Sequence, residues 1–219
     1  DMLKDPAFPE KELEVVVESN RQQFLVNSTR VEVIARKQLH RSLFGEQHPF
    51  GRFAQASDYD RITPDVLREF YRKYYHSGNC SVYVSGKVTP EIIRCIETNL
   101  GDTPWGEIRQ MPLLELIAPQ QTTEKHVFVE KADALQSSLK MGGFMMDRNH
   151  PDFLKARVMV TLFGGYFGSR LMSNIREDKG YTYGIGAGIV NCPGSGVLAI
   201  TTEADNQYID AIITEVYRE

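Results

Sequence analysis

The sequence lacks the features that mark several large classes of protein. Its 219 residues include only three cysteines and one tryptophan, and 29 acidic residues outnumber 25 basic ones. The resulting net charge of −4 argues against nucleic acid as the main partner, because nucleic-acid-binding proteins concentrate basic residues on one surface. No apolar run reaches the roughly 18 residues that a transmembrane helix needs, so we expect no membrane span.

Cysteine and histidine are too few and too scattered to indicate a metal or disulfide framework. Cys80, Cys95 and Cys192 are widely spaced and odd in number. Cys80 and Cys95 lie in apolar patterns, so we expect both to be small buried side chains. No two of the five histidines have the i, i+4 spacing that presents two ligands from one helix face. We expect isolated histidines with structural roles.

The first hundred residues alternate helical patterns with turn signals. Apolar residues recurring at three- and four-residue steps predict one long helix from Glu10 to Leu43. The segment Gly45–Gly51 is predicted as a loop. Thr63 and Thr89 each precede a proline and an acidic residue, which predicts two helix starts. The Val- and Tyr-rich run Asn79–Val84 predicts a strand.

A proline-rich stretch, residues 103–121, predicts a linker before a second strand-bearing part. The elements predicted after it are strands at His126–Val129 and Ser137–Phe144, a helix from Asp152 to Leu162, a helix capped by Ser169 and ending near Asp178, strands at Tyr181–Val190 and Gly196–Thr202, and a last helix capped by Asp205. Tight turns between neighbouring strands favour an α+β fold with a mostly antiparallel sheet over a doubly wound parallel sheet.

The most specific stretch runs from Phe163 to Gly188. It joins a glycine-rich turn, a short amphipathic helix with a charged end, and a strand rich in Tyr and Gly. Arg176 and Tyr183 are seven residues apart across the helix-to-strand turn. Strand alternation would put Tyr183 and Ile185 on one face and glycines on the other. The stretch has no Gly-Lys-Ser/Thr ending and its second glycine run follows no βα turn, so neither nucleotide-binding motif is indicated.

This arrangement resembles the substrate-binding half of the insulinase/pitrilysin family of zinc metallopeptidases, of the mitochondrial-processing-peptidase type. The resemblance implies that Arg176 and Tyr183 meet a bound peptide and stabilise charge on the scissile carbonyl, because a phenol and a guanidinium both donate hydrogen bonds. It also implies duplicated α+β modules with helices on one face of the sheet. Residues 1–102 would be the back half of a first module, 103–121 the linker, and 122–219 the front half of a second module.

The zinc motif of that family, His-x-x-Glu-His, is absent from the sequence. The family's third ligand is a glutamate on a long helix, and an ungapped match through Pro6–Phe8 puts Gln23 at its position. A neutral amide is a poor zinc ligand beside histidine. We therefore expect no metal site in this chain. Zinc would belong to the complete enzyme or to a partner, on an upstream segment or a partner subunit.

The resemblance implies part of a zinc metalloendopeptidase that binds an unfolded peptide and is inactive alone. One alternative is a catalytically inactive scaffold subunit, like the core proteins of a respiratory complex, and another is an unrelated α+β interaction domain. A His-x-x-Glu-His motif upstream of Asp1 or in an adjacent gene would favour the peptidase. The chain starts without Met and ends within a helical pattern, so we expect a piece of a longer soluble protein. Its compartment, periplasm or cytoplasm, stays open.

We predict that this chain alone binds no zinc, because no two histidines can supply paired ligands and Gln23 replaces the expected glutamate. Protein purified in zinc-containing buffer should carry well under one equivalent by elemental analysis. Gln23→Glu is the matched variant and should also remain unloaded, since one carboxylate cannot replace two histidines. Stoichiometric zinc on protein ligands would contradict the prediction.

Overall fold

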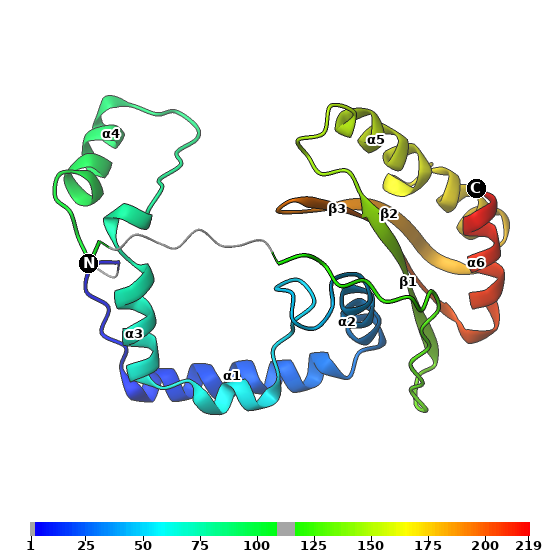
Figure 1. Cartoon of the computed structure of the whole chain (residues 1–219), viewed down its shortest axis with the longest axis horizontal. Helices are drawn as coiled ribbons and strands as arrows, with labels where there is room; N and C mark the ends of the chain where they lie inside the picture. The colour runs from blue at the N-terminus through cyan, green and yellow to red at the C-terminus, as the bar shows by residue number, and fades with distance from the viewer. Residues whose placement is uncertain (1–2, 109–116) are drawn as a thin grey trace. The chain divides into compact units, whose positions relative to one another are not determined.

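The computed structural model describes residues 3–108 and 117–219 and divides the chain into two compact units (Figure 1). Unit 1 comprises Asp1–Leu25 and Ala54–Glu115, and unit 2 comprises Val26–Phe53 and Leu116–Glu219. Residues 26–53 thus group with the second unit. Part of the expected linker, including Pro112, lies outside the described residues, so the division into two half-modules stays a prediction.

Unit 1 is mostly helical. Its helices are α1 (Glu10–Ser28, whose last turn belongs to unit 2), α3 (Pro64–Tyr74) and α4 (Pro90–Ile96), with short 3-10 turns at Ala56–Arg61 and Ser77–Asn79 and a π-helical turn at Glu97–Gly101. α3 starts as predicted, with the Thr63 hydroxyl accepting from the Val66 N–H at 3.3 Å. An ion pair of 2.9 Å between Arg21 and Asp60 joins α1 to the first 3-10 turn.

The single long helix expected from Glu10 to Leu43 is wrong. α1 ends at Ser28, and α2 (Val31–Phe44) begins after Arg30, whose backbone is extended at φ −73° and ψ 131°. The Thr29 hydroxyl donates to the Val26 carbonyl at 2.9 Å. Threonine side chains that bond to nearby backbone groups compete with the helical ladder, which accounts for the break.

The strands expected at Asn79–Val84 and His126–Val129 are also wrong. A strand needs a neighbour that takes up its backbone N–H and C=O groups, and neither segment is paired in the part of the chain that the structure describes. Tyr83 and Phe128 are 93% and 85% exposed. Cys80 is accordingly exposed rather than buried.

Cys95 is exposed as well, on α4, where the neighbouring Ile92 and Ile93 are also exposed. The apolar pattern of α4 therefore has no cover within the described residues. Cys192 is the buried cysteine of the three.

Unit 2 is built on a three-stranded antiparallel sheet of order β1–β3–β2. The strands are β1 (Gln136–Met145), β2 (Thr182–Cys192) and β3 (Ser195–Asp205). A tight turn joins β2 to β3, with Gly194 at φ 76°, a conformation that favours glycine. The expected α+β class with an antiparallel sheet is confirmed.

Helices cover both faces of this sheet, whereas the resemblance implied helices on one face alone (Figure 1). On one face lie α5 (Phe153–Val160), π-helical segments at Thr161–Gly165 and Met172–Asp178, and α6 (Ile209–Arg218). The core on that face consists of Leu171, Ile175, Ile185, Ile200, Ala204, Ile212 and Val216. Burial of one such Leu or Ile side chain contributes about 1.5–3 kcal/mol, so this cluster dominates the stability of unit 2. α2 packs Leu43 and Phe44 against Val197 on the other face.

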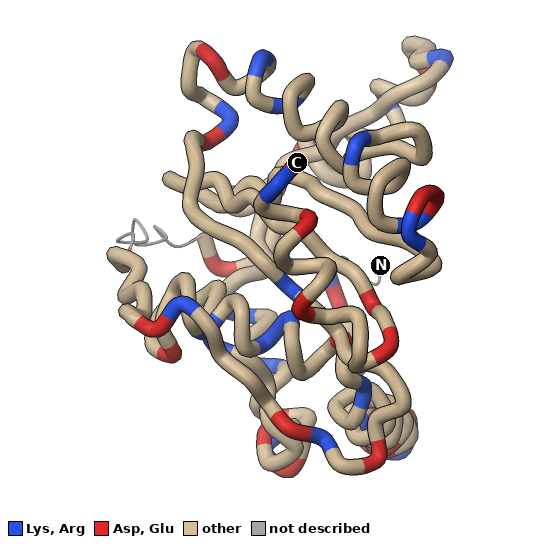
Figure 2. Tube along the Cα trace, turned by 90° about the vertical axis from the view of Figure 1, so that its right-hand side faces the viewer, with Lys and Arg blue, Asp and Glu red and all other residues tan. Residues whose placement is uncertain are grey.

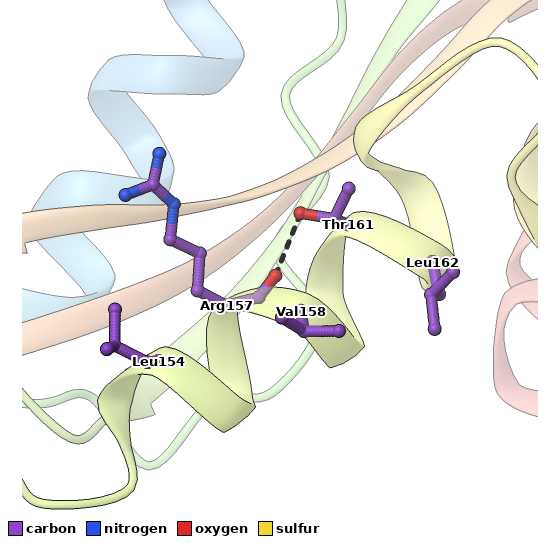
Figure 3. Close-up of a pocket in the computed structure, with 5 residues that line it drawn as sticks. All are labelled: Leu154, Arg157, Val158, Thr161 and Leu162. Atoms are coloured by element: carbon purple, nitrogen blue, oxygen red, sulfur yellow. Dashed lines mark hydrogen bonds between the residues drawn. The ribbon is translucent and has the colours of Figure 1, made fainter.

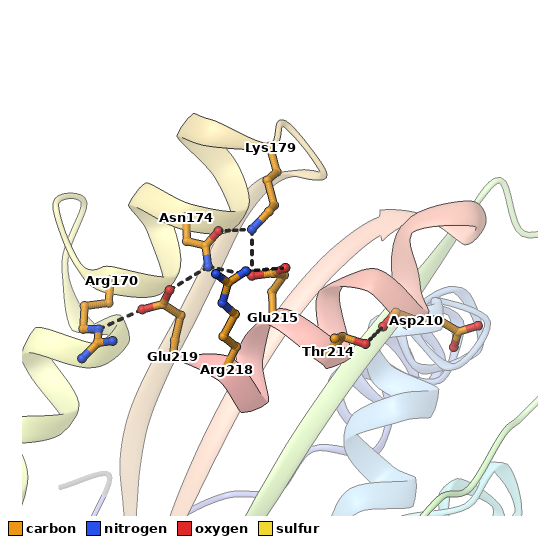
Figure 4. A network of polar contacts seen from close by, with 8 residues as sticks. All are labelled: Arg170, Asn174, Lys179, Asp210, Thr214, Glu215, Arg218 and Glu219. Atoms are coloured by element: carbon orange, nitrogen blue, oxygen red, sulfur yellow. Dashed lines mark hydrogen bonds and ion pairs between the residues drawn. The ribbon is translucent and has the colours of Figure 1, made fainter.

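A polar network joins α6 to the π-helical segment Met172–Asp178 and the residues beside it (Figure 4). Lys179 Nζ lies 2.7 Å from Glu215 Oε2, and Arg170 Nε lies 2.8 Å from Glu219 Oε2. Asn174 donates to both carboxylates, at 3.0 and 2.7 Å. Hydrogen bonds from Lys179 and Asn174 lower the pKa of Glu215, and the bond from Arg170 lowers the pKa of Glu219.

We expect unit 2 to lose the stabilisation that this network provides when the solution becomes acidic. The pKa of each glutamate is lower in the folded state than its ordinary value of about 4.3 in the unfolded chain. The stabilisation is therefore complete above that value and is lost as pH falls through it toward the folded-state pKa. Thermal unfolding followed by circular dichroism should show a lower Tm for Glu215→Gln than for wild type at pH 7.

That Tm difference should narrow as pH falls below about 4.3 toward the lowered folded-state pKa of Glu215, because protonation of the carboxylate removes the advantage that the ionised form has in the folded state. Glu130→Gln replaces an exposed carboxylate ahead of β1 and is the matched control, with no expected Tm difference. A Glu215→Gln difference that persists unchanged at pH 3 would mean that the ionised carboxylate contributes nothing.

Candidate functional site

The structure brings Arg176 and Tyr183 together where the helical layer meets β2. Arg176 Nε donates to the backbone carbonyl of Tyr183 at 2.9 Å. The guanidinium carbon lies 4.5 Å from the centre of the Phe167 ring, and Nη1 lies 3.8 Å from Glu177 Oε1. These contacts hold the Arg176 side chain on several sides. The side chain is nevertheless 34% exposed and can be reached from solvent.

Phe167 belongs to this cluster although its sequence position did not single it out. It lies in the glycine-rich turn, nine residues before Arg176, and is 62% exposed. An arginine stacked on an aromatic face gains a cation–π attraction, about 0.5–1 kcal/mol at an exposed site. We call Phe167, Arg176 and Tyr183 the Arg/Tyr cluster.

Tyr183 points away from the core because β2 carries a bulge. Thr182 pairs with Ala204 and Ile185 with Thr202, so three steps along β2 match two along β3. The extra residue interrupts strand alternation. Tyr183 is 92% exposed, whereas Ile185 is 4% exposed in the core. The expectation that these two side chains share one face is therefore wrong.

Glycine lets the helical layer approach β2 closely. A Cβ at Gly164 would stand 2.7 Å from both the backbone nitrogen and the Cβ of Ala187, which real Cβ atoms do not tolerate. Gly184 and Gly188 have open space where a Cβ would stand, so backbone can approach there. Ser169, expected as a helix cap, is instead buried, and its hydroxyl has no hydrogen-bond partner in the described residues.

An apolar stripe runs along the outer side of α5 and continues into the π-helical segment Thr161–Gly165. Leu154, Val158 and Leu162 follow one another at four-residue steps and are 70%, 61% and 55% exposed. Together with Arg157 and Thr161 they line a hollow of about 360 Å³ (Figure 3). We call Leu154, Val158 and Leu162 the α5 stripe. The exposure of three large apolar side chains in a row indicates a contact surface for another protein segment.

A second hollow, of about 520 Å³, lies between α5 and β2. Its polar side chains include Arg148, Arg157 and Asn191, while Gly165 and Gly188 contribute backbone. Two guanidinium groups make this hollow positive, which suits an anionic group such as a carboxylate.

The described residues do not fit a zinc ion. No group of three or more His, Cys, Asp or Glu side chains gathers among them. Gln23 is an exposed amide on α1. His40 Nδ1 lies 3.0 Å from the Phe50 carbonyl oxygen, and His48 Nδ1 accepts from the Phe50 N–H at 3.1 Å, so both have structural partners.

The surface charge is mixed. Basic and acidic residues are intermixed along the chain in both units (Figure 2). None of the helices in residues 3–108 and 117–219 is both long and apolar enough to cross a membrane.

Comparison with known proteins places the chain among peptidase-like proteins. Residues 61–219 match the family model described as the peptidase M16 inactive domain. A Helicobacter pylori protein named non-peptidase homolog YmxG is 25% identical over 189 residues, covering 84% of this chain and 42% of that protein. An uncharacterized zinc protease of Rickettsia bellii is 23% identical over 225 residues, covering 100% of this chain and 52% of that protein.

A crystal structure of the peptidase M16 inactive domain from Pseudomonas fluorescens matches 99% of this chain and 53% of that chain. Its TM-score is 0.81 at 23% sequence identity. At this identity the likeness shows the fold alone. The chain spans about half the length of the curated relatives that it matches.

Proposed function

Since the chain belongs to the peptidase M16 inactive-domain family, we propose that it is the peptide-binding, non-catalytic part of a zinc metalloendopeptidase. The Arg/Tyr cluster carries this proposal, because it combines an exposed phenol with a guanidinium held beside it. The described residues do not fit zinc. The zinc motif would therefore lie on an upstream segment or on a partner subunit, and the substrate would be an unfolded peptide.

The chemistry of the cluster suits a peptide carbonyl under attack. Hydrolysis develops negative charge on the carbonyl oxygen, and preorganised donors stabilise that charge. The phenol of Tyr183 can donate one hydrogen bond. Arg176 already uses Nε to bind the Tyr183 carbonyl, so its terminal nitrogens would face the peptide in the fixed planar geometry of a guanidinium. Gly184, with open space at its Cβ position, leaves room for the peptide backbone.

The exposed apolar surfaces support a second module as partner. No apolar side chain described in unit 1 is buried, and Val66 and Phe70 on α3 are 50% and 54% exposed. In unit 2 the α5 stripe is exposed. The curated relatives are about twice as long as this chain, so further family modules are the fitting occupants of these surfaces.

A scaffold role is the second candidate. The Helicobacter pylori relative is named a non-peptidase homolog, which favours a protein that binds a partner or peptide and cleaves nothing. The two candidates differ in one observable. A His-x-x-Glu-His motif in the upstream sequence or in a co-purifying subunit, together with chelator-sensitive cleavage of casein, supports the peptidase and excludes the scaffold.

We predict that Tyr183→Phe lowers kcat in the reconstituted enzyme and changes KM much less. Loss of one donor to a developing oxyanion costs about 10²–10³ in rate, and an effect confined to kcat marks an interaction made mainly in the transition state. Tyr217→Phe is the matched control, since Tyr217 is 74% exposed on α6. An unchanged kcat/KM for Tyr183→Phe would mean that the Tyr183 phenol does not stabilise the transition state.

A second prediction concerns the α5 stripe. Leu154→Glu combined with Val158→Glu should leave the Tm of this chain alone nearly unchanged, because both side chains are already exposed. The same pair should lower the Tm of the full-length protein or its complex, since a second module would then bury two charges. Tyr217→Glu serves as the exposed control. Equal effects in the two contexts would exclude the stripe as a contact surface.

A further inference from the structure

The bulge that presents Tyr183 leaves backbone groups without ladder partners. Between the pairs Thr182–Ala204 and Ile185–Thr202, β2 has two residues, Tyr183 and Gly184, where β3 has only Glu203. Backbone N–H and C=O groups near a buried strand must find other partners, because an unpaired group costs free energy comparable to a lost hydrogen bond. The partners they find determine how firmly Tyr183 is held.

Two threonine hydroxyls supply most of these partners. The Gly184 N–H donates to Thr182 Oγ1 at 3.1 Å. Thr202 Oγ1 lies 2.8 Å from the Gly184 carbonyl oxygen and 2.8 Å from Thr182 Oγ1. Thr182 Oγ1 in turn lies 2.6 Å from the Glu203 carbonyl oxygen. Each hydroxyl has one proton, so the two hydroxyls share these acceptors. Whichever acceptor each proton takes, the Gly184 N–H donates to Thr182 Oγ1.

The bulge is anchored in the core on both strands. Thr202 is 4% exposed and lies on the same face of β3 as Ile200 and Ala204. A buried hydroxyl among apolar neighbours is costly unless it is hydrogen-bonded, so its bonds to the bulge are retained. Its partner on β2, Ile185, is buried in the same cluster. Tyr183, two residues before Ile185, faces solvent.

We propose that Thr182 and Thr202 are positioning residues for the Arg/Tyr cluster. Their hydroxyls hold the Gly184 side of the bulge, and Arg176 holds the Tyr183 carbonyl, so the phenol projects in one direction from a rigid strand. Thr202 acts through the backbone of Gly184 and touches no ligand itself. The effect on peptide binding rests on the proposed function, whereas the effect on the bulge does not.

The test uses the full-length protein and fluorescein-labelled β-casein as an unfolded probe, with binding followed by fluorescence anisotropy. Thr202→Val keeps the shape of the side chain and removes the hydroxyl. It should raise Kd about tenfold, which corresponds to the loss of one hydrogen bond made by a buried hydroxyl. Thr202→Ser restores the hydroxyl and should recover most of the affinity. Thr201→Val is the control, since Thr201 is exposed on β3 and its hydroxyl contacts Lys140.

A double-mutant comparison separates positioning from general destabilisation. If Thr202 acts through the Arg/Tyr cluster, then Thr202→Val should cost little further affinity in an Arg176→Ala background, where the bond that holds the Tyr183 carbonyl is already lost. Full additivity of the two changes would overturn the proposal. So would an unchanged Kd for Thr202→Val.

Amide hydrogen exchange of Gly184 distinguishes failure of this proposal from failure of the proposed function. Faster exchange in Thr202→Val than in Thr201→Val is expected, because the Gly184 carbonyl and Thr182 Oγ1 both lose their bond to the Thr202 hydroxyl, so the bond from the Gly184 N–H to Thr182 Oγ1 should open more often. If the wild-type protein binds no casein, the proposed function of the Arg/Tyr cluster in peptide binding is wrong. If casein binds but exchange at Gly184 is unchanged by Thr202→Val, the hydroxyl pair does not hold the bulge and the proposal is wrong.

Discussion

The central position of β3 is the constraint on which unit 2 depends. β3 pairs with β1 on one side and with β2 on the other, and it contributes apolar side chains to both faces of the sheet. Ile200 and Ala204 pack against α6 and the π-helical layer, while Val197 packs against α2. A strand that packs side chains on both faces and is bonded on both edges cannot shift register without exposing its core side chains. The positions of the Arg/Tyr cluster and its bulge follow from that register.

Unit 1 shows what happens without such a strand. Its helices form where caps and prolines predict them, at Thr63 and Thr89, because those signals act within a few residues. None of its described apolar side chains is buried, however, and Asn79–Val84 stays unpaired in the described part of the chain. Local propensity can make a helix but cannot make a strand, since the hydrogen bonds of a strand belong to its neighbour.

The Arg/Tyr cluster was partly predictable from sequence. The spacing of Arg176 and Tyr183 across a helix-to-strand turn indicated that they lie near one another, and a 2.9 Å hydrogen bond joins them. The bond runs to the Tyr183 backbone, however, and the phenol extends away from the core. The π-helical geometry of Met172–Asp178 and the contribution of Phe167 had no clear sequence signal, because both depend on packing against β2. The catalytic role of the cluster stays a proposal.

By itself the sequence determined the fold class, the helix starts after Thr63 and Thr89, the paired strands of unit 2 and the absence of the zinc motif, because each of these depends on residue type and short-range spacing. Only the tertiary structure decided which of the predicted strands stay unpaired and where β2 bulges at Tyr183. Those features depend on which backbone groups find partners far away in the chain. Thr202 illustrates the difference: it is an ordinary strand residue in the sequence, and only the pairing of β2 with β3 places its hydroxyl against Gly184.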